Sequence, residues 1–179
     1  MIDRFFRIAV ITLLPAGFAQ GAVSDAQSDG FTVRQSVVID APRADVYIAA
    51  INHVGQWWSA DHTVSGDANN MYIEAKPQGC FCEALVSGGG VVHMTVTFVN
   101  PAVMLRLSGG LGPLGLMGVS GNMTWEFEDS DEGTSVTWNY AVGGYLPKGL
   151  DQIASAVDAV LSEQLNSLKR FVDDHPQQD

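Results

Sequence analysis

The sequence predicts a single α+β domain, in which an antiparallel sheet of about six to seven strands packs against one long C-terminal helix. Segments between residues 31 and 142 alternate apolar and polar side chains, as strands with one buried face do. Two short helical patterns follow the first of these segments. One long amphipathic pattern then ends the chain, and a run of strands followed by one helix is an α+β arrangement.

The first strand is expected at 31–40, where FTVRQSVVID is rich in β-branched residues. Pro42 stands near the start of a helix at 41–51, and VGQWWS at 54–59 fits a second short helix. An Asn-rich loop runs to Asn70. Further strands are expected in MYIEAK, CFCEALV, VVHMTVTFV and VMLRLS.

The last two strands, NMTWEFE (122–128) and SVTWNYAV (135–142), flank a hairpin turn at DSDEGT. Their alternation places Trp125, Phe127, Trp138 and Tyr140 on one face. From residue 148 to 172, apolar residues recur at helical spacing. We expect this long helix to cover the aromatic face of the sheet.

The N-terminal segment has the layout of a secretory signal peptide. Arg4 and Arg7 precede the short apolar run IAVITLL, Pro15 ends it, and Gly17 and Ala19 suit a cleavage site. Cleavage after Ala22 is the alternative, and so is an uncleaved anchor, although a membrane span needs about 20 apolar residues. We expect a signal peptide within residues 1–22, a disordered leader at 23–30, a domain at 31–173 and a polar tail at 174–179. The protein would then be exported, to a periplasm rather than through a eukaryotic secretory route.

The formal net charge is −11, without any basic cluster. Nucleic acids and anionic membrane surfaces are therefore poor partners. We expect no metal and no cofactor, because no set of His or Cys residues has ligand spacing.

Cys80 and Cys82 stand two residues apart in a predicted strand. In a regular strand such residues are about 6.6 Å apart, whereas a disulfide brings its Cβ atoms to roughly 3.8 Å. Export permits a disulfide, but this geometry predicts two free thiols.

Residues 108–118, SGGLGPLGLMG, contain the spacing G-x-G-x-x-G at Gly110, Gly112 and Gly115. A dinucleotide site needs a helix to begin at the third glycine. Pro113 and Gly118 interrupt any such helix, and a strand is predicted next, so we expect no nucleotide binding. The segment is either a mobile apolar loop over a cavity or a packed connection.

The sequence resembles the START-like (SRPBCC) superfamily over about residues 31–173, especially its polyketide-cyclase and chaperone-ATPase-activator-homologue branch. The residues that carry the resemblance are Asp40, Ala41, Pro42, Val46, Trp57 and Trp58, together with FVNPAVMLRL and GTSVTWNYAVGGY. It implies a helix-grip fold, a curved sheet wrapped around the C-terminal helix with a cavity between them. It also implies binding of lipid-like or polyketide-like molecules, or cyclase chemistry in some members.

The titratable residues do not form a catalytic constellation. His53, His62, His93 and His175 are expected to be ordinary polar residues. The alternation predicts that Glu83, Glu126 and Glu128 face solvent, while Asp158 is the acid that could approach the cavity. We therefore assign no catalytic residue.

Three functions remain: a carrier of a hydrophobic ligand, which we favour, a cyclase or lyase that uses the same cavity, and a protein-interaction module with an unknown protein partner. Buried Trp and Tyr side chains can orient a ligand through their polar atoms, and one of Trp57 and Trp58 is expected at the cavity rim. The predicted ligand-binding residues are Trp58, Met94, Leu114, Met117, Met123, Trp125, Trp138, Tyr140, Val157 and Leu161.

Overall fold

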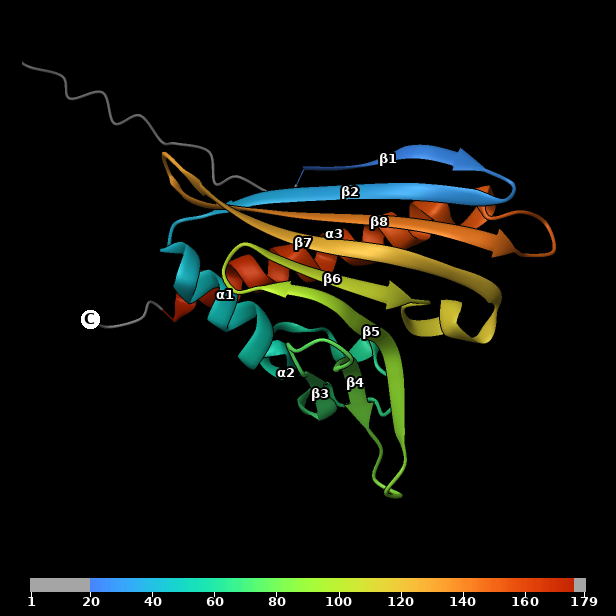
Figure 1. Ribbon diagram of the computed structural model, residues 1–179, viewed down its shortest axis with the longest axis horizontal. Coiled ribbons are helices and arrows are strands. Elements are labelled where there is room, and N and C mark those ends of the chain that lie inside the picture. Colours follow the sequence, from blue (N-terminus) through green and yellow to red (C-terminus); the bar gives the residue numbers. More distant parts are fainter. Residues whose placement is uncertain (1–19, 176–179) are drawn as a thin grey trace, which may run out of the picture.

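The computed structural model describes residues 20–175, which form one antiparallel sheet of eight strands with a long helix across it (Figure 1). The strands lie side by side in the order β1-β2-β8-β7-β6-β5-β4-β3. The elements are β1 (Gln20–Gln27), β2 (Gly30–Ile39), α1 (Arg43–Asn52), α2 (Val54–Trp57), β3 (Met71–Ile73), β4 (Cys80–Ala84), β5 (Gly90–Asn100), β6 (Met104–Gly109), β7 (Gly118–Ser130), β8 (Gly133–Tyr145) and α3 (Asp151–Asp174), with short 3-10 turns η1 (Ala60–His62), η2 (Ala68–Asn70) and η3 (Gly112–Leu116).

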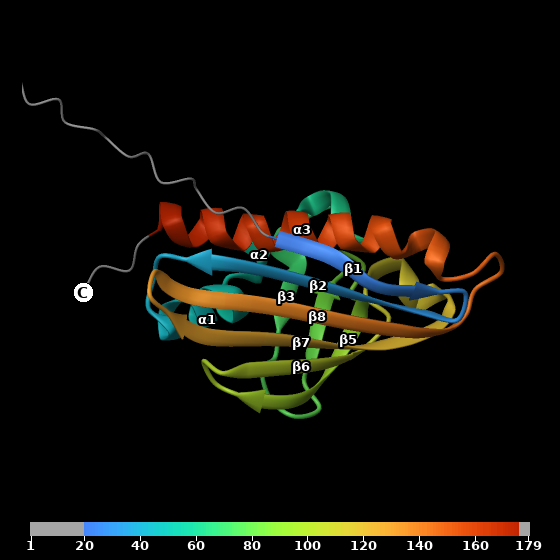
Figure 2. The same cartoon turned by 90° about the horizontal axis from the view of Figure 1, so that it is seen from above.

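This architecture is the predicted α+β helix-grip arrangement. Helix α3 runs along one face of the sheet, close to β1 and β2 (Figure 2). Its buried residues include Leu161, Leu165 and Leu168, so one stripe of the helix faces the core as the sequence periodicity predicted. Within the described residues, no helix combines the length and the apolar character that crossing a membrane requires.

The structure differs from the expectation of a disordered leader before residue 31. Gln20–Gln27 forms the edge strand β1, which pairs with β2 from Gln20 opposite Ser36 to Gln27 opposite Gly30. The segment is polar and gave no apolar alternation, so its pairing depends on backbone hydrogen bonds to β2 and on partial burial of Val23 and Ala26. The predicted signal peptide falls mostly on residues 1–19, which lie outside the described part of the chain.

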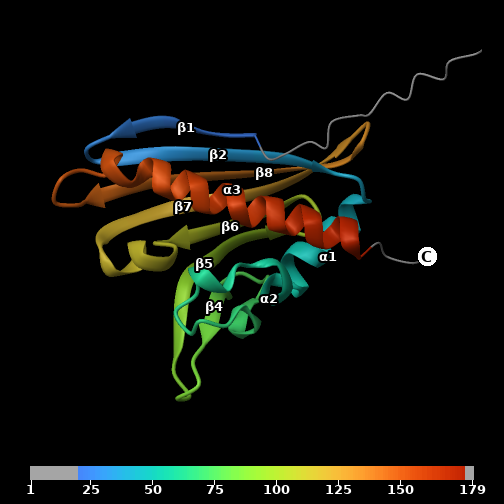
Figure 3. The same cartoon turned by 180° about the vertical axis from the view of Figure 1, so that it is seen from behind.

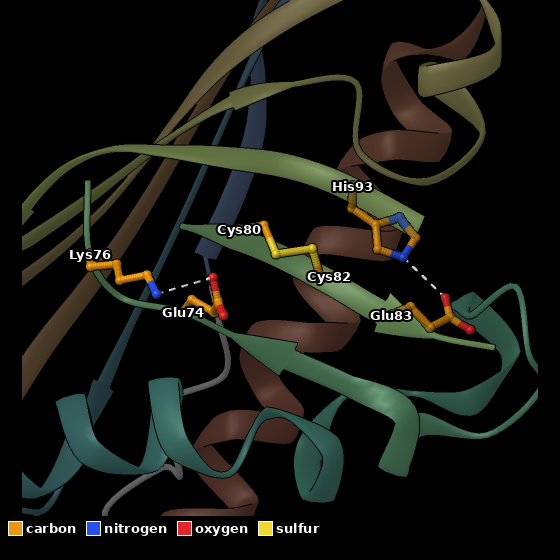
Figure 4. Close-up of a disulfide and its surroundings, with 6 residues drawn as sticks. All are labelled: Glu74, Lys76, Cys80, Cys82, Glu83 and His93. Atoms are coloured by element: carbon orange, nitrogen blue, oxygen red, sulfur yellow. Dashed lines mark hydrogen bonds and ion pairs between the residues drawn. A yellow bond between two sulfur atoms is a disulfide. The ribbon is translucent and has the colours of Figure 1, made fainter. Parts of the chain in front are cut away.

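The prediction of two free thiols is wrong, because Cys80 and Cys82 form a disulfide (Figure 4). Their Cα atoms lie 5.4 Å apart, closer than in a regular strand and within the range that a disulfide bridges. The pairing with β5 is also irregular at this point: Phe81 pairs with Met94 and Cys82 with Val92, so His93 is an extra residue in β5 and forms a β-bulge. A bulge bends and twists the paired strands locally, and the period-2 geometry behind the prediction does not hold there.

Candidate ligand-binding cavity

A cavity of about 660 Å³ lies between α3, β5, the η3 segment and the loop that contains η1. This volume is in the range of sites that hold drug-sized molecules. The walls are mainly apolar. Residues 110–117, here called the η3 segment, and helix α3 supply apolar side chains that include Leu111, Leu114, Met117, Ile153, Val157, Val160 and Leu161. The cavity is at the η3 end of the sheet, and α1 lies at the opposite end (Figures 1 and 3).

The η3 segment is held in place by Tyr140. The Tyr140 hydroxyl donates a hydrogen bond to the Gly109 carbonyl (3.0 Å) and accepts one from the Leu111 amide (3.1 Å). Burial raises the pKa of this hydroxyl, so it stays protonated and able to donate. The glycine-rich sequence is therefore one wall of the cavity. It contains a five-residue 3-10 turn that leads into β7, so no long helix begins at its third glycine, as the sequence predicted.

The opposite wall, around η1, is tied to α3 and to α2. Trp58 Nε1 donates to the His62 carbonyl (3.1 Å), and the Ser59 amide donates to Oε1 of Gln164 on α3 (2.8 Å). His62 Nε2 lies 3.3 Å from Glu163, also on α3. These contacts fix the loop as a wall, although its sequence is polar and irregular.

The mouth of the cavity exposes apolar side chains. Val64, Val92 and Leu116 all line the cavity, yet their exposed fractions are 62%, 63% and 92%. They come from three separate segments, so the rim is apolar on several sides. Such a rim fits the entry of an apolar molecule.

A buried pair of polar side chains stands beside the cavity. Glu83 on β4 and His93 on β5 are both buried, and His93 Nε2 lies 3.0 Å from a carboxylate oxygen of Glu83 (Figure 4). Glu83 also accepts hydrogen bonds from the backbone amides of Val64 (2.9 Å) and Ser65. One carboxylate therefore joins two strands to the loop that forms the cavity wall.

Two opposing influences act on the pKa of Glu83. Burial raises the pKa, but the hydrogen bonds from Ser65, Val64 and His93 together lower it below its ordinary value. The carboxylate is therefore charged at neutral pH and acts as an acceptor only. The expectation that Glu83 faces solvent is wrong, because the loop at 63–65 folds over it and supplies its donors.

The model for the family described as polyketide cyclase / dehydrase and lipid transport matches residues 30–173. The chain belongs to this family. The match confirms the predicted START-like resemblance, and it spans both strands of the Glu83–His93 pair and all walls of the cavity.

Solved structures share the fold of this family member at low sequence identity. An uncharacterised protein from Rhizobium leguminosarum is 18% identical with a TM-score of 0.58, over 89% of this chain and 99% of that one. A protein of unknown function from Staphylococcus aureus is 12% identical with a TM-score of 0.61, over 84% and 98%. CalU16 from Micromonospora echinospora is 16% identical with a TM-score of 0.54, over 88% and 87%. A search of curated proteins finds no match.

The structure divides the predicted ligand-binding residues of this family member into two groups. Trp58, Leu114, Met117, Tyr140, Val157 and Leu161 lie in the cavity wall. Met94, Met123, Trp125 and Trp138 do not line the cavity and lie in the packed core, almost fully buried. Trp57 joins that core, with its ring centroid 6.1 Å from Trp125 and 6.0 Å from Trp138.

Sequence reasoning missed the η1 loop and His93 as parts of the cavity wall. His93 was expected to be an ordinary polar residue, but it is the extra residue of the β-bulge and is buried. A loop such as the one around η1 gives no periodic signal at all. Asp158, the acid expected near the cavity, instead accepts a hydrogen bond of 2.6 Å from Gln35 on β2. Over residues 20–175, no cluster of three His, Cys, Asp or Glu side chains could hold a metal ion.

Proposed function

We propose that this protein binds a hydrophobic small molecule, lipid-like or polyketide-like, in the cavity between α3, β5 and η3. The observation that carries the proposal is the cavity itself: about 660 Å³, apolar walls, and a mouth rimmed by exposed Val64, Val92 and Leu116. Membership of a family of polyketide cyclases and lipid transport proteins supports the same class of ligand.

Binding fits the described walls better than cyclase or lyase chemistry that uses a carboxylic acid in the cavity. Of the described residues that line the cavity, Asp61 is the one carboxylate, and it is exposed. Asp158 is held by Gln35, and Glu83 is held by three hydrogen-bonding partners. No carboxylate is thus buried and free inside the cavity to act as a general acid.

The test is to fill the cavity from α3. Val157→Trp places a large ring in the wall, whereas Ala159→Trp places the same ring on the exposed face of the same helix, outside the cavity. We expect wild type and Ala159→Trp to bind the apolar fluorophore phenylnaphthylamine with similar affinity. Val157→Trp should bind it at least about tenfold more weakly. Urea unfolding of both variants is the control that tests whether each variant is folded. If wild type does not bind the fluorophore, or if Val157→Trp binds it equally, the proposal is contradicted.

We further propose that the protein is exported, with cleavage after Ala19. The described part of β1 runs from Gln20 to Gln27 and pairs with β2, and cleavage after Ala22 would remove three of these residues, whereas cleavage after Ala19 would remove none. The Cys80–Cys82 disulfide supports an oxidising compartment such as a periplasm. The intact mass of the exported protein tests this: we expect Gln20 as the first residue, and a mass that retains Met1–Leu14 would refute cleavage.

A further inference from the structure

His93 has a ring nitrogen that no group among the described residues uses. The residue is 4% exposed and lies in the cavity wall. Its Nε2 is paired with Glu83, but its Nδ1 is buried without a hydrogen-bond partner among the described residues. Leaving a buried polar atom unpaired is costly, and each such atom in a native structure requires an explanation.

Glu83 fixes which nitrogen of His93 carries the proton. The charged carboxylate can only accept hydrogen bonds, so Nε2 must be the nitrogen that donates. A second proton on Nδ1 would create a buried N–H donor without an acceptor. Nδ1 lies on the edge of the ring turned away from Glu83 (Figure 4), and in the tautomer that carries its proton on Nε2 it is a hydrogen-bond acceptor.

The other polar side chains in the cavity wall already have partners or face solvent. Tyr140 donates to the Gly109 carbonyl, Thr63 donates to the Ala60 carbonyl, and His62 is paired with Glu163. Asp61 is exposed. In the described walls, His93 Nδ1 is thus the polar atom left without a partner, and because its own accessible surface is close to zero, a ligand reaches it only when the side chains that cover it shift.

We propose that His93 Nδ1 accepts a hydrogen bond from a hydroxyl group of the bound molecule, with Glu83 as the positioning residue. The ligand class is then an apolar molecule that carries a hydroxyl, rather than a pure hydrocarbon. The inference rests on the proposed function, because it assumes that a molecule occupies the cavity. One oriented acceptor in an apolar site fixes the orientation of a ligand as well as its identity.

The test compares two molecules that differ by one group, α-naphthol and α-methylnaphthalene, on wild type, His93→Phe and His53→Phe. His53 is a half-buried histidine outside the cavity wall, so His53→Phe is the matched control. We expect His93→Phe to weaken α-naphthol binding by roughly 2- to 10-fold, the range for one net hydrogen bond. Its binding of α-methylnaphthalene should be unchanged or tighter, and His53→Phe should bind both as wild type does.

Nitrogen NMR of the His93 ring in the wild-type protein gives a readout that does not depend on variant folding. We expect the free protein to show a protonated Nε2 and a bare Nδ1, and α-naphthol to shift the Nδ1 signal as the nitrogen accepts a hydrogen bond. α-Methylnaphthalene should leave that signal in place.

The outcomes separate the two proposals. A proton on Nδ1, or an Nδ1 signal unchanged by bound α-naphthol, overturns the inference. Equal losses for both molecules in His93→Phe also overturn it, while the proposed function survives because α-methylnaphthalene binds wild type. If neither molecule binds wild type, the proposed function fails and the inference fails with it.

Discussion

The indole rings of Trp125 and Trp138 are stacked across neighbouring strands, with centroids 4.5 Å apart and planes inclined by 16°. The two residues are directly paired in the β7–β8 register and almost fully buried. The aromatic face of the sheet is therefore a packed core, and the cavity lies beside it, toward η3. The sequence pattern predicted Trp138 as a ligand-binding residue, but the structure places it in the packed core and the cavity elsewhere.

Trp138→Ala should therefore lower the free energy of unfolding by about 3–5 kcal/mol, as removal of a large buried ring does. Because Trp138 does not line the cavity, binding of phenylnaphthylamine should persist under conditions where the variant is folded. Trp138→Phe is the matched variant: it keeps a ring and removes an indole N–H that has no hydrogen-bond partner among the described residues, so its cost should be clearly smaller. Urea unfolding measures both, and a loss below about 1 kcal/mol for Trp138→Ala would contradict the packed core.

The stability of the protein should depend on the charge of Glu83. The folded state holds the pKa of Glu83 below its ordinary value, so its stabilising effect is present above the unfolded pKa of about 4.3 and is lost as the pH falls through the folded pKa. Glu83→Gln should cost about 1–3 kcal/mol at neutral pH. As the pH is lowered into the acid range, the unfolding free energy of Glu83→Gln should then fall less steeply than that of wild type.

Urea unfolding of both proteins at a series of pH values, from neutral pH to below the pKa of Glu83, checks this prediction. Glu128→Gln is the control, because Glu128 is an exposed glutamate on β7. It should follow the wild-type pH profile closely. Parallel acid profiles for wild type and Glu83→Gln would show that Glu83 does not contribute through its charge.

The hydroxyl of Tyr140 should control the mobility of the η3 segment. Tyr140→Phe removes the group that links Gly109 and Leu111, and should cost about 1–2 kcal/mol. Hydrogen exchange of the Leu111 amide should accelerate, because its acceptor is lost. Tyr145→Phe, at an exposed position, should leave this exchange unchanged. Unaltered protection of Leu111 in Tyr140→Phe would mean that another contact holds the segment.

The disulfide should be detected by labelling. Under denaturing conditions, Cys80 and Cys82 should resist alkylation until a reductant is added, whereas free thiols would be labelled at once. The loop between them is very short, and the entropy that a disulfide removes from the unfolded chain grows with loop length. Cys80→Ser with Cys82→Ser should thus cost only about 1–2 kcal/mol, measured by urea unfolding.

Local patterns in the sequence determined most of the architecture. Alternation in β7 and β8 gave their strands, their buried face and their hairpin turn, and helical spacing gave α3 with its buried stripe. These predictions succeeded because the side-chain periods of strands and helices are set by backbone geometry alone. The apolar loop pattern indicated Leu114 and Met117 as residues over a cavity, and the family resemblance added the helix-grip arrangement, in which Val157 and Leu161 of the long helix face the same cavity.

Tertiary structure decided what depends on contacts between distant segments. The polar strand β1 exists because β2 offers it a paired edge. The β4–β5 pairing has a bulge at His93, where the period of two breaks, and the same region holds the Cys80–Cys82 disulfide and the His93–Glu83 contact. The loop at 63–65 then covers Glu83 and builds a wall of the cavity. The sequence by itself determined which face of β7, β8 and α3 is apolar. A bulge and a docked loop depend on segments far along the chain, so local periodicity does not predict them.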